Sequence, residues 1–181
     1  MPKPRSHILP FAIPAMVIIV LFLKEQGFKT SIVPSLSIPK MSSFPVAQNT
    51  SSLDELKQSV HQRVNEYRAS QNLPPLKLDP RISQEAKQHS EAMASGEVPF
   101  SHAGSKQRFD TIGETIPYQK IAENVGYNMG YSDPAQKVVQ GWINSEGHRR
   151  NIEGNFDLTG IGIAKNAKGE YYFTQIFVRT R

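Results

Sequence analysis

The stretch that decides the fold runs from Leu158 to Val178 and reads LTGIGIAKNAKGEYYFTQIFV. Its first part, Leu158–Ala164, is apolar apart from one threonine, and Glu170–Val178 is rich in the aromatic and β-branched residues that favour strands. The intervening KNAKG ends in glycine, which readily adopts the backbone conformations of a tight turn. The stretch therefore predicts a β-hairpin.

Three helices are predicted before this hairpin. Two of them begin with an Asp-Pro pair, Asp79–Pro80 and Asp133–Pro134, which places a capping carboxylate before a proline at the first helical position. The earliest helix begins at the capping box SLDE, Ser52–Glu55. Each start is followed by apolar residues at helical spacing. They are Leu53, Leu56, Val60, Val64 and Tyr67 in the first helix, Ile82, Ala86, His89 and Met93 in the second, and Val138, Val139, Trp142 and Ile143 in the third.

The order of these elements indicates the fold class. The second helix is expected to stop at Gly96, and a further strand is expected near Tyr118–Gly126. Helices precede the hairpin, and strands and helices do not alternate as they do in βαβ units. The pattern therefore predicts an α+β sandwich.

The N-terminal part of the chain predicts a membrane anchor and a linker. ILPFAIPAMVIIVLFL, Ile8–Leu23, is a run of 16 residues without charge, about 24 Å long as a helix. Two basic residues precede it and no small-x-small cleavage pattern follows it, so we expect residues 1–26 to be an uncleaved signal-anchor with one transmembrane helix. The alternative is a cleaved signal peptide and a secreted protein. Residues 27–52, rich in Ser and Pro, predict an extended linker to a domain over residues 53–181, outside the cytoplasm in the periplasm or at the cell surface.

Charge and cysteine content exclude several classes of function. Residues 1–50 carry five Lys/Arg and one Glu, whereas residues 51–181 carry 16 Lys/Arg and 15 Asp/Glu and are nearly neutral. Because the folded part lacks a basic footprint, we expect no nucleic-acid partner. The chain has no cysteine, which excludes disulfides, thiolate metal sites and a cysteine nucleophile.

Three residues are the candidates for chemistry: His102 in VPFSHAGS, Glu123 in IAENVG and His148 in SEGHRR. Glu123 stands in an otherwise apolar stretch, where a carboxylate is costly to bury without a partner. Two histidines and a carboxylate suit a zinc-type ion, and they equally suit general acid–base chemistry. Both interpretations stay open, because no short ligand motif links the three residues. His89 lies on an apolar stripe and is expected to be a histidine with a hydrogen-bond partner at the edge of the core.

Five blocks of sequence in order resemble one known family. They are VNEYRASQNLPPLKLDPRISQEAKQHSEAMA, FSHAG, AENVG, WINSEGHRRNI and GIGIAKNAKGEYYFTQIFV. The chain resembles the CAP superfamily, which comprises cysteine-rich secretory proteins, antigen 5 and pathogenesis-related proteins and is also called the SCP domain, and within it the cysteine-free bacterial branch. The resemblance covers roughly residues 53–181, about seven-tenths of the chain. It implies a three-layer α-β-α sandwich for the domain.

The resemblance also implies a site. The family has a cleft lined by two histidines and two acidic residues, which in some members hold a divalent cation. FSHAG carries the first histidine onto His102, AENVG carries a glutamate onto Glu123, and the GHR motif of bacterial members carries the second histidine onto His148. Eukaryotic members have that histidine where this chain has Tyr172. Glu146 is a doubtful ligand, because it stands one position beyond the family's second acid and one position turns a helical side chain by about 100°.

The residues and the resemblance together leave three functions open. The first is a binding module for a lipid, a peptide or another cell-envelope ligand, with or without a divalent, zinc-type ion. The second is a metal-assisted hydrolase in which His102 and His148 hold the ion and Glu123 activates water. The third is a structural envelope protein without a site. Whether the chain is an enzyme is therefore left open by its sequence.

Overall fold

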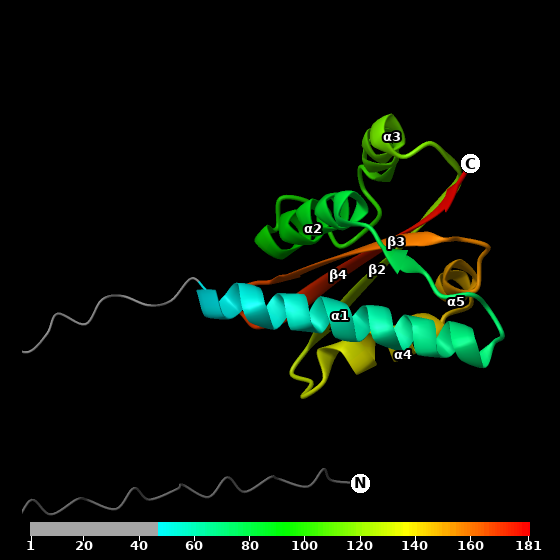
Figure 1. Ribbon diagram of the computed structural model, residues 1–181. Helices are drawn as coiled ribbons and strands as arrows, with labels where there is room; N and C mark the ends of the chain where they lie inside the picture. Colours follow the sequence, from blue (N-terminus) through cyan, green and yellow to red (C-terminus); the bar gives the residue numbers. More distant parts are fainter. Residues whose placement is uncertain (1–46) are drawn as a thin grey trace, which may run out of the picture. The chain divides into compact units, whose positions relative to one another are not determined.

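The computed structural model describes residues 47–181, with side chains from residue 52 onward. The expected signal-anchor, residues 1–26, and most of the linker lie outside the described residues. Between residues 47 and 181, no helix has both the length and the hydrophobicity needed to cross a membrane. The elements in chain order are α1 (Ala47–Ser70), β1 (Lys77–Leu78), α2 (Pro80–Ser95), α3 (Ser105–Thr115), β2 (Tyr118–Met129), α4 (Pro134–Asn144), α5 (Glu146–Ile152), β3 (Leu158–Lys165) and β4 (Glu170–Thr180) (Figure 1).

The strands form one sheet in the order β1-β3-β4-β2. The predicted hairpin is confirmed: β3 and β4 are antiparallel neighbours, and Gly169 in their turn has a φ of +84°. The short β1 lies parallel to β3. β2 pairs with the other side of β4 and is the edge strand of the sheet, with Glu123 opposite Ile176 and Tyr127 opposite Tyr172.

Helices cover both faces of this sheet, which confirms the predicted α+β sandwich. In Figure 1, α2 and α3 lie above the sheet, and α1 and α4 lie below it. Alternate side chains of β4 enter two separate cores: Phe173 and Phe177 pack with residues of α1 and α4, whereas Ile176 and Val178 pack with residues of α2 and α3. The two faces of β4 therefore hold the two helical layers together.

The glycines of GIGI allow α2 to pack directly on β3. A Cβ atom on Gly160 would lie 2.3 Å from the backbone of Ile82, and one on Gly162 would lie 2.1 Å from the backbone of Ala86. Side chains at these two positions would push α2 away from the sheet. Ile161 and Ile163 point to the opposite face, into the core beneath α1.

The predicted caps of two helices are confirmed. The Asp79 side chain accepts a hydrogen bond from the Arg81 amide at the start of α2, and the Asp133 side chain accepts one from the Gln136 amide at the start of α4. Gly96 ends α2 in the left-handed conformation, with a φ of +79°. The Asp-Pro pairs thus set the start of both helices.

Three features differ from the prediction. The first helix begins at Ala47, so Ser52 lies inside α1 instead of capping it. The third predicted helix breaks at Ser145, whose extended backbone (φ −95°, ψ 118°) separates α4 from α5 and places His148 in the shorter helix. The helix α3 was not predicted, because its N-cap is Gly104, which has no side chain to signal a helix start.

Candidate functional site

Glu123 is the charged residue around which the candidate site is built. It lies on β2, and only 2% of its side-chain surface is exposed. Arg108 of α3 faces both carboxylate oxygens: its Nε donates to Oε2 at 3.0 Å, and its Nη2 lies 2.9 Å from Oε1 and 2.8 Å from Oε2. Such planar, two-point pairs of arginine and carboxylate are among the strongest charged hydrogen bonds. Arg108 therefore supplies the partner that a buried Glu123 requires.

His102 is the second partner of Glu123. Its Nδ1 lies 2.9 Å from Glu123 Oε1. An ionised carboxylate only accepts hydrogen bonds, so Nδ1 carries the hydrogen, and in the neutral ring the lone pair lies on Nε2. The His102 side chain is 52% exposed, and Nε2 makes no hydrogen bond within residues 52–181. The carboxylate thus orients an imidazole whose other nitrogen is free to meet a ligand.

The loop that carries His102 is anchored on both sides of it. Buried His89 of α2 donates from Nε2 to the Ser101 carbonyl at 2.8 Å. On the other side, Arg108 Nη1 donates to the Ala103 carbonyl at 2.7 Å. Burial lowers the pKa of His89, so its ring stays neutral to lower pH than a free histidine. The expectation that His89 is a core-edge histidine with a partner is confirmed, and that partner positions His102.

His148 lies on α5, which is fixed to the edge strand β2 by two asparagines. Asn124, fully buried on β2, donates to the His148 carbonyl at 3.1 Å. Asn151 of α5 donates to Asn124 Oδ1 at 2.9 Å. The His148 ring is hydrogen-bonded through Nδ1 to Ser145 Oγ at 2.8 Å. Burial lowers the pKa of His148, and the charge of a protonated His102 lowers it further.

The structure thus brings His102 into contact with Glu123 and His148 into their neighbourhood, but it leaves Glu146 outside. The Glu146 carboxylate pairs with Arg150 at 2.6 Å on the surface of α5, and 73% of its side chain is exposed. Glu146 is the first residue of α5 and faces solvent. Tyr172 packs against Tyr127 of the edge strand.

A divalent cation does not fit the contacts of Glu123. Within residues 52–181, no group of three or more histidine and acidic side chains is placed to hold a metal ion. Arg108 engages both carboxylate oxygens, so Glu123 could bind a cation only by giving up that pair, and the guanidinium would repel the ion. The metal site at His102, Glu123 and His148 therefore stays a prediction.

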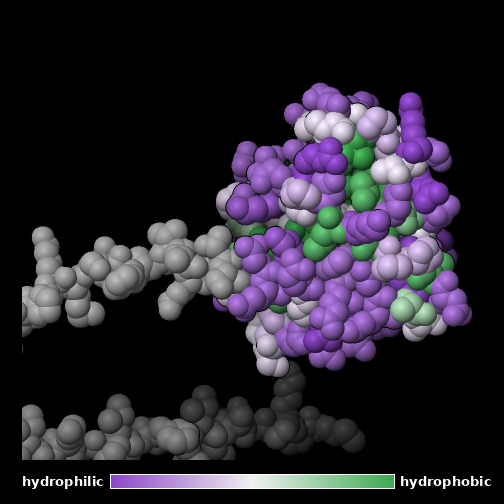
Figure 2. All heavy atoms as spheres, viewed as in Figure 1, coloured by the Kyte–Doolittle hydropathy of each residue, from purple (hydrophilic) through white to green (hydrophobic). Residues whose placement is uncertain are grey.

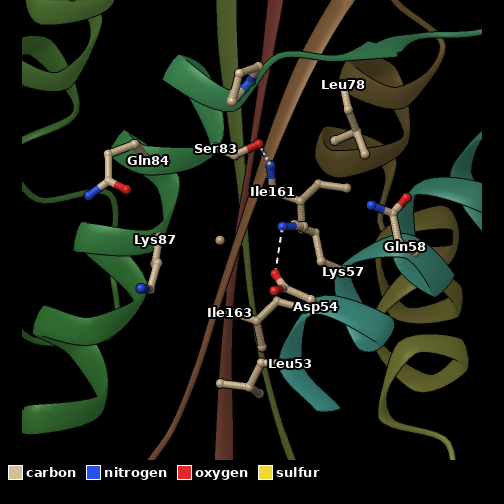
Figure 3. A pocket seen from close by; sticks show the side chains of 12 residues that line it. Leu53, Asp54, Lys57, Gln58, Leu78, Ser83, Gln84, Lys87, Ile161 and Ile163 are labelled. Carbon is tan, nitrogen blue, oxygen red and sulfur yellow. Dashed lines mark hydrogen bonds and ion pairs between the residues drawn. The ribbon is translucent and has the colours of Figure 1, made fainter. Parts of the chain in front are cut away.

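A separate groove lies between α1 and α2 (Figure 3). It has a volume of about 380 Å³ and a floor formed by Leu53, Ile161 and Ile163. Two lysines at its rim have acidic neighbours. Lys57 pairs with Asp54 at 2.7 Å, and Lys87 of α2 pairs with Glu91 at 3.5 Å. Figure 2 shows hydrophobic side chains in a strip above α1 within an otherwise mostly hydrophilic surface. None of the site residues described above lines this groove.

Sequence reasoning missed Arg108, Asn124 and Asn151 as parts of the site. The signal for Arg108 was indirect: a glutamate in an apolar stretch predicts a buried cation somewhere, but the sequence does not say which one. The two asparagines carried no signal, because nothing in their sequence context indicates a contact between them. Their role depends on how α5 meets β2 in space.

Comparisons with known proteins agree with this architecture. The chain is 36% identical over 119 residues to the uncharacterized membrane protein YlbC of Bacillus subtilis, covering 64% of this chain and 32% of the relative. A crystal structure of an extracellular protein containing an SCP domain from Bacillus anthracis superposes with a TM-score of 0.60 at 28% identity, covering 76% of this chain and 45% of that one. An outer surface protein of Borrelia burgdorferi gives the same TM-score of 0.60 at 18% identity, covering 70% of this chain and 94% of that one, and shows the fold alone.

The chain spans about a third of the length of YlbC and less than half of the B. anthracis protein. The family match covers more than half of this chain. The sequence model of the CAP family, described as the cysteine-rich secretory protein family, matches residues 61–177, which include α2, the whole sheet except the last residues of β4, and all the site residues. The chain therefore belongs to the CAP family, although it has no cysteine of its own.

Proposed function

We propose that the chain is a membrane-anchored, extracytoplasmic binding module that holds a cell-envelope ligand at His102, Glu123 and Arg108. The proposal rests on the pairing of Glu123 with Arg108. In this pairing the carboxylate serves to position His102, whose Nε2 makes no hydrogen bond among the described residues. A carboxylate held in this way is poorly suited to activate water or to hold an ion. A rigid, half-exposed imidazole is well suited to meet a polar group of a ligand.

The experiment is a binding assay with the full chain, purified in mild detergent. It is sedimented with purified peptidoglycan sacculi. Separately, it is floated with phosphatidylglycerol vesicles, and only binding in excess of that to neutral phosphatidylcholine vesicles is counted, because the anchor inserts into either bilayer. The His102→Ala variant should bind about tenfold more weakly than the wild type, which is the upper end of the net contribution of one hydrogen bond. Glu146→Gln is the matched control, because that side chain is 73% exposed and, among the described residues, its carboxylate pairs with Arg150.

Absence of binding to both preparations by the wild-type chain would refute the binding module. Equal binding by wild type and His102→Ala would instead move the ligand away from this residue. The buried Trp142, the only tryptophan of the chain, reports through its fluorescence whether each variant is folded.

The anchored, extracytoplasmic location is part of the proposal. It is supported by the uncharged run Ile8–Leu23 and by the names of two relatives, which are a membrane protein and an extracellular protein. Because the chain has no cysteine, a single cysteine can report topology. A membrane-impermeant maleimide should label exposed Glu97→Cys on intact cells and should leave fully buried Ser90→Cys unlabelled. Labelling of Glu97→Cys only after lysis would place the domain in the cytoplasm.

A hydrolase is the second candidate, because the carboxylate of Glu123 orients His102 as such groups orient a general base. Its test is turnover of chromogenic ester and peptide substrates by the wild-type chain. Turnover that disappears in His102→Ala while Trp142 fluorescence stays native would favour the hydrolase. Binding without turnover would favour the module.

A further inference from the structure

Three aromatic rings from distant parts of the chain meet at the end of the sheet where β4 begins. Phe100 comes from the loop after α2, Tyr127 from β2 and Tyr172 from β4. Their ring centroids lie 5.3 Å apart for the two tyrosines, and 6.2 and 6.5 Å from Phe100 to Tyr127 and Tyr172. We call these three residues the aromatic cluster.

The aromatic cluster is held rigidly by polar groups. Tyr127 Oη donates to Glu170 Oε1 at 3.1 Å, and Tyr172 Oη donates to Oε2 at 3.4 Å. Asn166 in the β3–β4 turn also donates to this carboxylate. These hydrogen bonds, that of Asn166 above all, lower the pKa of Glu170, so the group that fixes both hydroxyls stays ionised. The tyrosine rings are therefore ordered without being buried.

The exposure of the cluster indicates a binding surface. Phe100 is 52% exposed and Tyr127 is 43% exposed, whereas Phe173 and Phe177 of β4 are fully buried. Adjacent rings left in water forgo the stabilisation that burial would give, and contiguous exposed apolar surface marks interaction sites. Nothing in the fold requires Phe100 at this place, since its loop is anchored through Ser101 and Ala103.

The cluster lies in line with the site at His102. Glu123 and Tyr127 have the same parity on β2 and therefore project from the same face of the sheet, about 13 Å apart along the strand. Phe100 and His102 share one loop. A ligand long enough to cover the rings and reach His102 would therefore follow the edge strand, which favours an extended polymer over a small molecule.

The chemistry of the cluster discriminates between ligand classes. The rings touch one another, so they leave no space to enclose a cation between them. The ionised Glu170 beside them opposes an anionic lipid surface. The exposed rings lie beside the carboxylate of Glu170 and the amide of Asn166. This combination matches a sugar ring, whose C–H face stacks on an aromatic ring while its hydroxyls hydrogen-bond the neighbouring polar groups.

We propose that the aromatic cluster binds a glycan chain of pyranose sugars that runs along β2 toward His102. This inference rests on the proposed function and names its ligand class. The rings supply the contact area, and Glu170 and Asn166 hydrogen-bond to the hydroxyls at the edge of the sugar. His102 contacts the next sugar along the glycan.

The test uses soluble chitohexaose and cellohexaose as probes, titrated calorimetrically into the full chain in detergent. Phe100→Ala and Tyr127→Ala should each weaken binding about tenfold, the loss of one aromatic contact with its buried area. Tyr127→Phe keeps the ring and should retain most of the affinity. The matched control is Tyr131→Ala, because Tyr131 is 49% exposed but stacks under the Lys137 ammonium instead of joining the cluster.

Each outcome separates this inference from the function on which it rests. Binding of either sugar that is lost in the two alanine variants and kept in Tyr131→Ala supports the glycan site. Binding of sacculi by wild type that the sugars do not compete for, or that both alanine variants retain, overturns the glycan site and leaves the binding module intact. Cluster-dependent binding of phosphatidylglycerol vesicles without sugar binding also overturns it, because the rings would then be a membrane contact. No binding of sacculi, vesicles or sugars refutes both.

Discussion

Replacing Arg108 by methionine should cost the domain much of its stability, because it removes the counter-charge of a buried carboxylate. Side-chain exposure is 2% for Glu123 and 11% for Arg108, so water screens this pair little. Breaking one partner of a buried ion pair costs about 3–5 kcal/mol. We expect about 3 kcal/mol for Arg108→Met, which is a large part of the roughly 5–15 kcal/mol typical of a domain.

The double variant Arg108→Met/Glu123→Gln separates the ion pair from the packing of its stems. With the charge of Glu123 gone, the methionine no longer leaves a carboxylate unpaired, so the double variant should be more stable than the sum of the two single changes predicts by about 2 kcal/mol. Urea unfolding followed by Trp142 fluorescence is a suitable assay, because Trp142 Nε1 donates to the Val125 carbonyl at 2.9 Å, two residues from Glu123. A coupling energy below about 0.5 kcal/mol would refute the reasoning that the pair is buried and mutually dependent.

Three further perturbations test other parts of the structure. Gly162→Ala should destabilise the domain by about 1–3 kcal/mol in urea unfolding, because its Cβ would lie 2.1 Å from the backbone of α2, whereas Gly147→Ala, with no atom within 4 Å, should not destabilise it. Burial lowers the pKa of His89 below its ordinary 6.5, so the unfolded chain binds the proton more readily. The free energy of unfolding should therefore fall as the pH drops below about 6.5, and the fall should be smaller in His89→Gln. Calorimetric titration with zinc chloride should give no stoichiometric binding, because Arg108 holds Glu123; one zinc per chain, lost in His102→Ala, would establish the metal site.

The sequence predicts the elements of the fold whose ends carry local signals. Both Asp-Pro helix starts and the hairpin turn at Gly169 are marked by residues with strong backbone preferences. The helix α3 follows the N-cap Gly104 and buries only Arg108 and Ile112, so neither a capping side chain nor an apolar stripe reveals it. The break at Ser145 has no proline to announce it, and it separates two segments that read as one helix.

The length of β2 was harder to predict for a related reason. Four consecutive residues, 123–126, are buried, because α4 and α5 cover one side of the strand and α3 covers the other. The alternation that identifies a half-buried strand is therefore missing. Two of the buried side chains on this strand, Asn124 and Asn128, are polar and bond to the backbone of α5 and α4. The expected strand Tyr118–Gly126 therefore ends three residues before β2 does, because the last part of β2 is held by polar contacts that a pattern of hydrophobicity does not show.

The candidate site shows why a sequence motif predicts the positions of residues more securely than it predicts their chemistry. The blocks FSHAG and AENVG bring His102 and Glu123 to the expected places, and the two side chains meet at 2.9 Å. Whether that carboxylate can bind a cation depends on Arg108, which lies between the two blocks and belongs to neither. A domain of the same fold with an apolar residue at this position would leave the glutamate free to hold a cation or a proton. The charge at position 108 therefore decides whether Glu123 is available to bind a cation or a proton. We expect this availability to change when residue 108 is exchanged.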